Sequence, residues 1–352
     1  MRILHVSDCF PPRLGGIETQ VETLVSEQRG RGHVVHVLTL TNGPEGELIT
    51  RLKAHFQKSL LVRFGSTRDI GVVYEEFRPD VIHIHIGSGA WLGWAAVKFA
   101  KRNNIPAVLS IHSIWGKFAN FTYTKWLTAT PRFRFVTVSQ QARNSLQTGA
   151  QGVVIANGLS VHEWQGQSPK KETITFITAS RLVKRKRLIE LVEMFARLHK
   201  RHPQNSFQLR IAGDGPLKKR IEHMLQSHDQ EYVKLLGRLT KVELQEEFAS
   251  AHAYIQLSKL EAFGLAAAEA QASGLGVIGL RASGISDFVT HKVDGFLGES
   301  DTQIEAFLDT SIDEPLVLQN LRDNVDVNSK PYLWSLVLEK YDSLYVSVTS
   351  GQ

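Results

Sequence analysis

Residues 174–187 read ITFITASRLVKRKR, in which a short apolar run is followed directly by a cluster of basic side chains. The run ITFITA is uncharged and rich in β-branched residues, which is typical of a strand that is buried on both faces of a parallel sheet. Similar runs follow, separated by helical stretches: FQLRIAG from Phe207, YVKLLG from Tyr232, AYIQLS from Ala253 and VIGL from Val277. This alternation predicts a doubly wound α/β domain.

The first half of the chain shows the same alternation. Its apolar runs are RILHVS from Arg2, HVVHVLTLT from His33, DVIHIHI from Asp80, PAVLSIH from Pro106, FRFVTVS from Phe133 and VVIAN from Val153. A polar linker, residues 170–173, separates the two series, and an amphipathic helix is predicted over residues 331–346. We therefore expect two doubly wound, Rossmann-like domains, residues 1–165 and 166–330, that face a central cleft, and a terminal helical segment, residues 331–352, that crosses back to the first domain.

The composition is typical of a folded, globular protein. Of the 352 residues, 42% are hydrophobic and 22% are charged. The single cysteine, Cys9, cannot form an intramolecular disulfide, which favours a reducing compartment. Asp8 interrupts the first apolar run, so no signal peptide is predicted, and the longest mostly apolar stretch, residues 86–97, is far shorter than the ~20 residues of a membrane-spanning helix. These features predict a cytoplasmic protein.

The charge of the chain favours anionic partners. The net charge of +6 does not by itself choose among nucleotides, acidic lipid surfaces and nucleic acid. Five of the seven residues 181–187 are basic, a pattern that is often a solvated face and is also found in nucleic-acid patches. Because this run follows a predicted strand directly, at the edge where α/β sheets bind ligands, we favour phosphate binding by part of it.

Two glycine-containing segments also follow predicted strands. Gly15 and Gly16, within FPPRLGGIE, precede a predicted helix, where glycine lets backbone N–H groups approach an anion closely. Their spacing is not G-x-G-x-x-G, and a loop that only needs flexibility is the alternative. The segment AGDGP, residues 212–216, places Pro216 in the first turn of a helix, and a structural turn explains it as well as a ligand contact does.

The segment SKLEAFGLAAAEAQASGLGVIGL, from Ser258, carries two carboxylates at a predicted helix start. Glu261 lies in a loop, residues 263–265 open the helix, and Glu269 lies about a turn and a half inside it. The first amides of a helix suit a phosphate, and Glu269 can accept hydrogen bonds from vicinal hydroxyls such as those of a ribose. A surface glutamate followed by an ordinary helical glutamate is the alternative.

Taken in order, the segments GGIE, ASRLVKRK, AGDGP and EAFGLAAAEA resemble the retaining nucleotide-sugar glycosyltransferases of family 4, group 1 type, which have the GT-B fold. Further matching segments are GHVVHVLT from Gly32, ANGL from Ala156, SGISDFV from Ser283 and VDGFL from Val293. The resemblance covers nearly the whole chain. It implies sugar transfer from a nucleoside-diphosphate sugar to a glycan, lipid-linked or small-molecule hydroxyl, without a cofactor and without a metal ion.

The resemblance also assigns residues to this chemistry. It implies donor binding by Gly15, Gly16, Arg181, Lys186, Phe263, Gly264, Leu265 and Glu269. The catalytic residues it implies are His112, which lines the sugar site, Arg181 and Lys186, which neutralise the pyrophosphate, and Glu261, which holds sugar hydroxyls. Glu269 would hold the ribose.

The leaving pyrophosphate gains negative charge as the sugar departs, so cations and helix amides would act where charge develops. No pair of carboxylates indicates a covalent nucleophile, and the resemblance implies front-side transfer with retention. His83 and His85 share a strand face, but two histidines make no metal site without further ligands. Arg187 replaces the glycine that usually follows the lysine, and we expect its charge beside the phosphate site or in solvent.

Several alternatives stay open. A sugar-nucleotide epimerase or hydrolase, and a catalytically silent nucleotide-sugar-binding relative, would share the fold. Nucleic-acid binding is not expected, because no recognition motif accompanies the basic run. Two basic stretches, residues 51–68 and 117–135, are interpreted either as docking sites for an anionic inner membrane surface or as solvated faces beside an acceptor loop.

Overall fold

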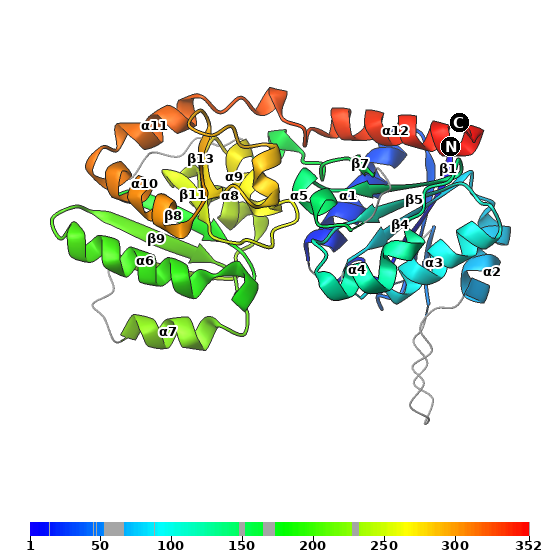
Figure 1. Cartoon of the computed structure of the whole chain (residues 1–352), viewed down its shortest axis with the longest axis horizontal. Coiled ribbons are helices and arrows are strands. Elements are labelled where there is room, and N and C mark those ends of the chain that lie inside the picture. Colours follow the sequence, from blue (N-terminus) through cyan, green and yellow to red (C-terminus); the bar gives the residue numbers. More distant parts are fainter. Residues whose placement is uncertain are drawn as a thin grey trace. The chain divides into compact units, whose positions relative to one another are not determined.

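The computed structural model describes every residue except 14, 45, 47, 53–66, 88, 148–151, 165–172, 227–231 and 352. The chain divides into two compact units: unit 1 comprises Met1–Gly158 and Trp334–Gln352, and unit 2 comprises Leu159–Leu333. Each unit is built on one parallel sheet with helices packed on its faces (Figure 1). Both sheets have the doubly wound α/β arrangement that the alternating pattern predicts.

Unit 1 contains a seven-stranded parallel sheet in the order β3-β2-β1-β4-β5-β6-β7. Its strands are β1 (Arg2–Ser7), β2 (Val34–Thr39), β3 (Ile49–Arg51), β4 (Val81–Ile86), β5 (Ala107–Ile111), β6 (Phe133–Thr137) and β7 (Val153–Val154). Its helices are α1 (Gly16–Gly30), α2 (Thr67–Phe77), α3 (Trp91–Arg102), α4 (Lys117–Tyr123), α5 (Gln140–Asn144) and α12 (Trp334–Ser350). The strand order reverses between β1 and β4, which are hydrogen-bonded neighbours.

The two faces of this sheet are covered by different helices. Val21 and Leu24 of α1 and Val337 and Leu338 of α12 pack on one face, whereas α2 and α3 pack on the other. The terminal helix lies in unit 1 because its apolar side completes the layer that α1 begins.

Unit 2 contains a six-stranded parallel sheet in the order β10-β9-β8-β11-β12-β13. Its strands are β8 (Ile174–Ala179), β9 (Phe207–Ala212), β10 (Val233–Gly237), β11 (Ala253–Gln256), β12 (Gly276–Leu280) and β13 (Gly295–Gly298). Its helices are α6 (Leu188–Arg201), α7 (Lys218–Gln226), α8 (Lys241–Ala249), α9 (Leu265–Ala272), α10 (Asp301–Asp313) and α11 (Leu316–Asp323). The strand order reverses between β8 and β11, so the loops that leave these strands are placed to form a ligand site.

The division between the units falls a few residues before the boundary expected at 165/166. The amide of Leu159 donates to the carbonyl of Tyr332 at 2.7 Å, and the Trp164 ring packs on Phe248, so this segment is held within unit 2. The strands β3 and β13 were not predicted as strands, because runs of three or four residues are too short to show a period.

Candidate functional site

In unit 2, the loops that leave β8 and β11 are joined by an ion pair between Lys186 and Glu261. The two side chains are 17% and 11% exposed, so water screens the pair only weakly. Ser258 Oγ donates to the carbonyl of Arg185 at 3.2 Å, and the amide of Gly284 donates to the carbonyl of Glu261 at 2.8 Å. These bonds hold a cation and a carboxylate together at the ligand-binding edge of the sheet.

The AGDGP segment, residues 212–216, packs against the basic loop that follows β8, residues 180–187. Leu182 donates its amide to the carbonyl of Asp214 at 2.9 Å. A Cβ on Gly213 would lie 1.9 Å from the carbonyl oxygen of Ser180, and one on Gly215 would lie 2.7 Å from that of Leu182. Both glycines also have positive φ angles, 133° and 156°. The structure therefore favours the structural-turn interpretation of this segment.

Arg181 and Arg187 have different surroundings. Arg181 is exposed, and its guanidinium has no ion-pair or hydrogen-bond partner among the residues that the structure describes. Arg187 forms a bidentate pair with Asp301, at 2.9 and 2.6 Å, and contacts Glu190 at 3.3 Å. The hydrogen bonds to Asp301 raise the pKa of Arg187. Unit 2 therefore neutralises this charge internally, so the expectation of a solvated charge is wrong, and its placement beside a phosphate site stays a prediction.

The first turn of α9 presents unpaired backbone amides. The N–H groups of Phe263, Gly264 and Leu265 have no acceptor within the described part of the chain. The Phe263 side chain is buried against Phe288, so only its backbone is available to a ligand. Gly264 has a φ of 94°, and a Cβ there would lie 2.7 Å from Ile285 Cγ2. This close, left-handed turn requires glycine and turns the chain into the helix.

Glu269 lies farther along α9 without a partner for its carboxyl group. Among the described residues, this carboxyl accepts no hydrogen bond and forms no ion pair. Burial raises its pKa to about 7, although the charge of Lys241 acts in the opposite direction. A desolvated carboxyl without a partner is costly for the fold, and such groups are candidates for ligand binding.

In unit 1, Gly15 and Gly16 lie at the start of α1, as the sequence predicts, and the Glu18 side chain folds over Gly15. A Cβ on Gly15 would lie 2.3 Å from Glu18 Oε2, so a side chain at this position would displace the Glu18 carboxylate. Glu18 also pairs with Arg13 at 2.9 Å. Burial raises the pKa of the Cys9 thiol to about 11, with Glu18 contributing, so Cys9 is not a thiolate at neutral pH.

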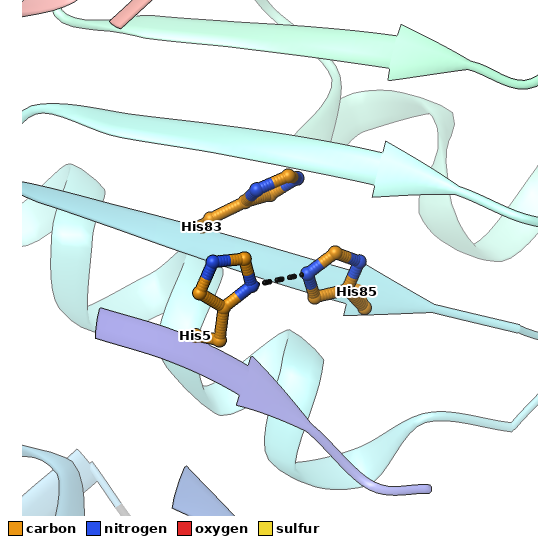
Figure 2. Close-up of side chains that lie close together, drawn as sticks. All are labelled: His5, His83 and His85. Atoms are coloured by element: carbon orange, nitrogen blue, oxygen red, sulfur yellow. Dashed lines mark hydrogen bonds between the residues drawn. The ribbon is translucent and has the colours of Figure 1, made fainter. Parts of the chain in front are cut away.

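Four histidines of unit 1 cluster on the side of the sheet that α1 and α12 cover, and hydrogen bonds link three of them. His5 Nδ1 contacts His85 Nε2 at 2.8 Å (Figure 2), and His85 Nδ1 contacts His112 Nε2 at 3.1 Å. His5 of β1 lies opposite His83 of β4 in the strand register. The sequence singles out His83, His85 and His112, but it does not connect His5 with them. The period of two along β1 and β4, combined with their adjacency in the sheet, is the signal that was missed.

One ring nitrogen from each of His5, His83 and His85 lies within 4.8 Å of the other two, a spacing that a metal ion could use. All six nitrogens already have hydrogen-bond partners: His83 contacts Tyr345 Oη at 2.6 Å and Ser110 Oγ at 2.7 Å, and the other two rings contact each other and their neighbours. A metal ion would have to break several of these bonds. The absence of a metal from the chemistry stays a prediction.

Comparison with known proteins covers both units. A model of Glycosyltransferase Family 4 matches residues 14–163, and a model of Glycosyl transferases group 1 matches residues 160–330. The chain belongs to the family 4, group 1 glycosyltransferases. The glycosyltransferase has the GT-B fold. It superposes on a sucrose-phosphate synthase from Thermosynechococcus elongatus with a TM-score of 0.80, at 17% identity and with 100% of both chains covered.

Two curated proteins and one further solved structure are similar to the glycosyltransferase. It is 25% identical to the gpi3 subunit of phosphatidylinositol N-acetylglucosaminyltransferase from Schizosaccharomyces pombe, over 98% of this chain and 80% of that protein. It is 23% identical to the alpha-monoglucosyldiacylglycerol synthase of Acholeplasma laidlawii, over 99% and 97%. The structure of Anabaena HepE in complex with UDP and glucose matches with a TM-score of 0.76, at 17% identity, over 98% and 100%.

Proposed function

We propose that this glycosyltransferase moves a sugar from a nucleoside-diphosphate sugar to an acceptor hydroxyl, with retention of the anomeric configuration and without a metal ion. The observation that carries the proposal is the arrangement at the carboxyl ends of β8 and β11. There the Lys186–Glu261 pair and the unpaired amides of residues 263–265 lie on adjoining loops, and the exposed Arg181 follows β8 directly. This set offers positive charge to a diphosphate and a carboxylate to sugar hydroxyls.

Each group acts where the reaction changes charge. As the bond between the sugar and the diphosphate breaks, negative charge grows on the leaving phosphate, and Arg181, Lys186 and the α9 amides stabilise it. Glu261 accepts hydrogen bonds from the transferred sugar, and Glu269 accepts them from the ribose. In unit 1, His112 contributes a contact to a sugar. The acceptor hydroxyl loses its proton to an oxygen of the departing phosphate.

A thermal-shift panel with UDP, GDP, ADP and their sugar conjugates, each with and without magnesium, tests the donor site. HepE was crystallised with UDP and with UDP-glucose, which makes the uridine compounds the first probes. A ligand at 100 times its Kd should stabilise the folded protein by about 2.7 kcal/mol. We expect a shift with one nucleotide family, independent of magnesium. No shift with any compound would contradict the proposed donor site, a shift without turnover would favour a catalytically silent relative, and donor turnover that needs no acceptor would favour a hydrolase or epimerase.

We further propose that the acceptor is a lipid at an anionic membrane surface. Phe118 and Phe121 of α4 are 79% and 89% exposed and one helical turn apart, with the exposed Lys117 and Lys125 beside them in the sequence. Exposed aromatic rings beside lysines suit an anionic bilayer surface. The names of two relatives refer to phosphatidylinositol and to diacylglycerol. In the described part of the chain, no helix is long and apolar enough to cross a bilayer.

The other basic stretch, residues 51–68, offers less support for membrane docking. Arg51 donates to the carbonyls of Pro11, Thr41 and Pro44, so its guanidinium holds loops together. The predicted basic residues Lys53, Lys58 and Arg63 lie outside the described residues. The exposed Arg68 is the other described member of the set.

Co-sedimentation at low salt with phosphatidylglycerol vesicles, compared with phosphatidylcholine vesicles, tests membrane docking. We expect binding to the anionic vesicles that falls at least fivefold in a Phe118→Ser, Phe121→Ser double variant. The control is Leu316→Ser, which removes a side chain of α11 that is 75% exposed. Equal binding to both kinds of vesicle, or equal loss in both variants, would contradict the membrane proposal.

A further inference from the structure

A chain of hydrogen bonds in unit 1 begins at Gln28, runs through His5 and His85, and ends at His112. Gln28 Oε1 contacts His5 Nε2 at 2.7 Å, the chain continues through the His5–His85 contact (Figure 2), and it ends with the His85–His112 contact. We propose that Gln28, His5 and His85 are positioning residues that hold His112 in one neutral tautomer, with Nε2 protonated and Nδ1 free to accept a hydrogen bond. The role of His112 toward a sugar rests on the proposed function, whereas the tautomer does not.

The rings of this chain are neutral at physiological pH. Burial lowers the pKa of His5 and of His112 to about 4, and it lowers the pKa of His85 well below its ordinary value. A neutral imidazole has one N–H donor and one bare nitrogen. Each hydrogen bond in the chain therefore needs a protonated nitrogen on one ring and a bare nitrogen on the next, which couples the tautomers of all the rings.

The Gln28 amide sets the direction of the chain. Its nitrogen donates to Tyr345 Oη at 2.9 Å, which leaves its oxygen to accept from His5 Nε2. His5 Nδ1 is then the acceptor for His85 Nε2, and His85 Nδ1 is the acceptor for His112 Nε2. Every later bond follows from that first one, because each neutral ring has one donor and one acceptor.

The open end of the chain is His112 Nδ1. This atom is buried, and among the described residues no hydrogen bond of good geometry reaches it. The Asn157 side chain interacts with His112 and opposes the effect of burial on its pKa. Asn157 imposes no direction, because an amide can turn either its oxygen or its nitrogen toward the ring. A bare Nδ1 can accept a hydrogen bond but cannot donate one.

His83 provides a matched control within the same cluster. It lies two residues from His85 on β4 and is as deeply buried, but it bonds to Tyr345 and Ser110 and not to His112. Removing His83 should therefore disturb packing to a similar degree while the chain from Gln28 to His112 stays intact.

Two-bond ¹H–¹⁵N correlation spectra of the ¹⁵N-histidine-labelled full chain test the tautomer directly. The His112 signals are assigned from their loss in His112→Asn. We expect a protonated Nε2 and a bare Nδ1 for His112, unchanged between about pH 6 and pH 8 because its pKa is about 4. A protonated Nδ1, an imidazolium or an averaged tautomer signature would overturn the proposal.

Variants of His85 then connect the tautomer with the reaction. His85→Leu removes the acceptor for His112 Nε2, so we expect an averaged or reversed tautomer and at least a fivefold loss in kcat/KM for the donor. His85→Asn supplies an oxygen acceptor and should recover the single tautomer and part of that loss. His83→Leu should lower Tm and leave the His112 tautomer unchanged. An unchanged tautomer in His85→Leu, or an equal change in His83→Leu, would refute the positioning role. If no nucleotide sugar binds, the proposed function fails, and the spectra still decide the tautomer.

Discussion

Lys186 and Glu261, 75 positions apart in the sequence, form an ion pair between the loops that leave β8 and β11. Each side chain neutralises the other, so both largely buried charges have a partner of opposite sign. The proposed function gives them different ligands, the diphosphate for Lys186 and sugar hydroxyls for Glu261. A bound donor must therefore contact these two side chains while they stay paired, or replace the ion pair with its own contacts. Substitution of one partner should consequently affect nucleotide binding and sugar transfer differently.

Glu261→Gln should lower turnover at saturating donor at least tenfold, about 1.4 kcal/mol, because an amide is a weaker acceptor for sugar hydroxyls than a carboxylate. Binding of the nucleoside diphosphate alone should be unchanged or tighter, because the substitution frees Lys186 and removes a nearby negative charge. Initial rates and calorimetry measure the two effects. The control is Glu163→Gln, which breaks the exposed Lys241–Glu163 pair in the same unit. Unchanged turnover in Glu261→Gln would refute its role.

Arg181→Ala should weaken binding of the nucleoside diphosphate about tenfold, or about 1.4 kcal/mol. Because Arg181 is exposed and unpaired among the described residues, the free energy of unfolding should change by less than about 0.5 kcal/mol. Calorimetric titration and chemical denaturation give the two numbers. Lys200→Ala removes the same charge at the far end of α6 and serves as the control. Equal affinities in the two variants would count against a phosphate contact by Arg181.

Glu269→Gln should raise Tm at pH 8 and have little effect at pH 4. The pKa of Glu269 is about 7 in the folded protein, against an ordinary value of 4.5. Below pH 4.5 the carboxyl is protonated in both the folded and the unfolded state. Between pH 4.5 and pH 7 the carboxyl ionises in the unfolded chain but stays protonated in the folded protein, which lowers the free energy of unfolding of the wild type. The glutamine variant has no such titration and keeps its stability. Thermal melts at both pH values check this, with Glu246→Gln, an exposed position, as the control.

The same carboxyl should make nucleotide binding dependent on pH. If the ionised Glu269 accepts hydrogen bonds from the ribose, affinity should fall as pH drops below about 7, where the carboxyl becomes protonated. The Kd of the nucleoside diphosphate, measured by calorimetry from pH 6 to pH 8, should follow this titration, and Glu269→Gln should abolish that dependence. A variant with the wild-type pH profile would rule out the ribose contact.

Arg187→Gly should be more stable than Arg187→Ala by about 1 kcal/mol. Both substitutions remove the bidentate pair with Asp301, but only glycine relieves the left-handed backbone at this position, where φ is 57°. Urea denaturation of the two variants isolates the backbone contribution, because the lost ion pair cancels in the comparison. An alanine variant as stable as the glycine variant would show that this conformation carries no strain.

The local pattern of the sequence was sufficient for the architecture and for the position of the candidate site. Alternating strands and helices predict the two doubly wound sheets, and the basic run from Arg181 to Lys186 lies directly after β8, as predicted. Such predictions succeed because a strand that is buried on both faces, and the start of a helix, each favour particular residue types at consecutive positions. The assignment of individual site residues to the donor stays a prediction.

The relationships among distant side chains came only from the tertiary structure. The Lys186–Glu261 pair depends on β8 and β11 being neighbours, and the His5–His85 contact depends on β1 lying beside β4. Strand order is set by how whole helices and strands pack, which no local period encodes. The sequence by itself therefore determined which elements form and which charges follow them. The packing of the sheets decided which of those charges and imidazole rings meet, because a hydrogen bond or ion pair requires contact within a few ångströms between residues far apart in the chain.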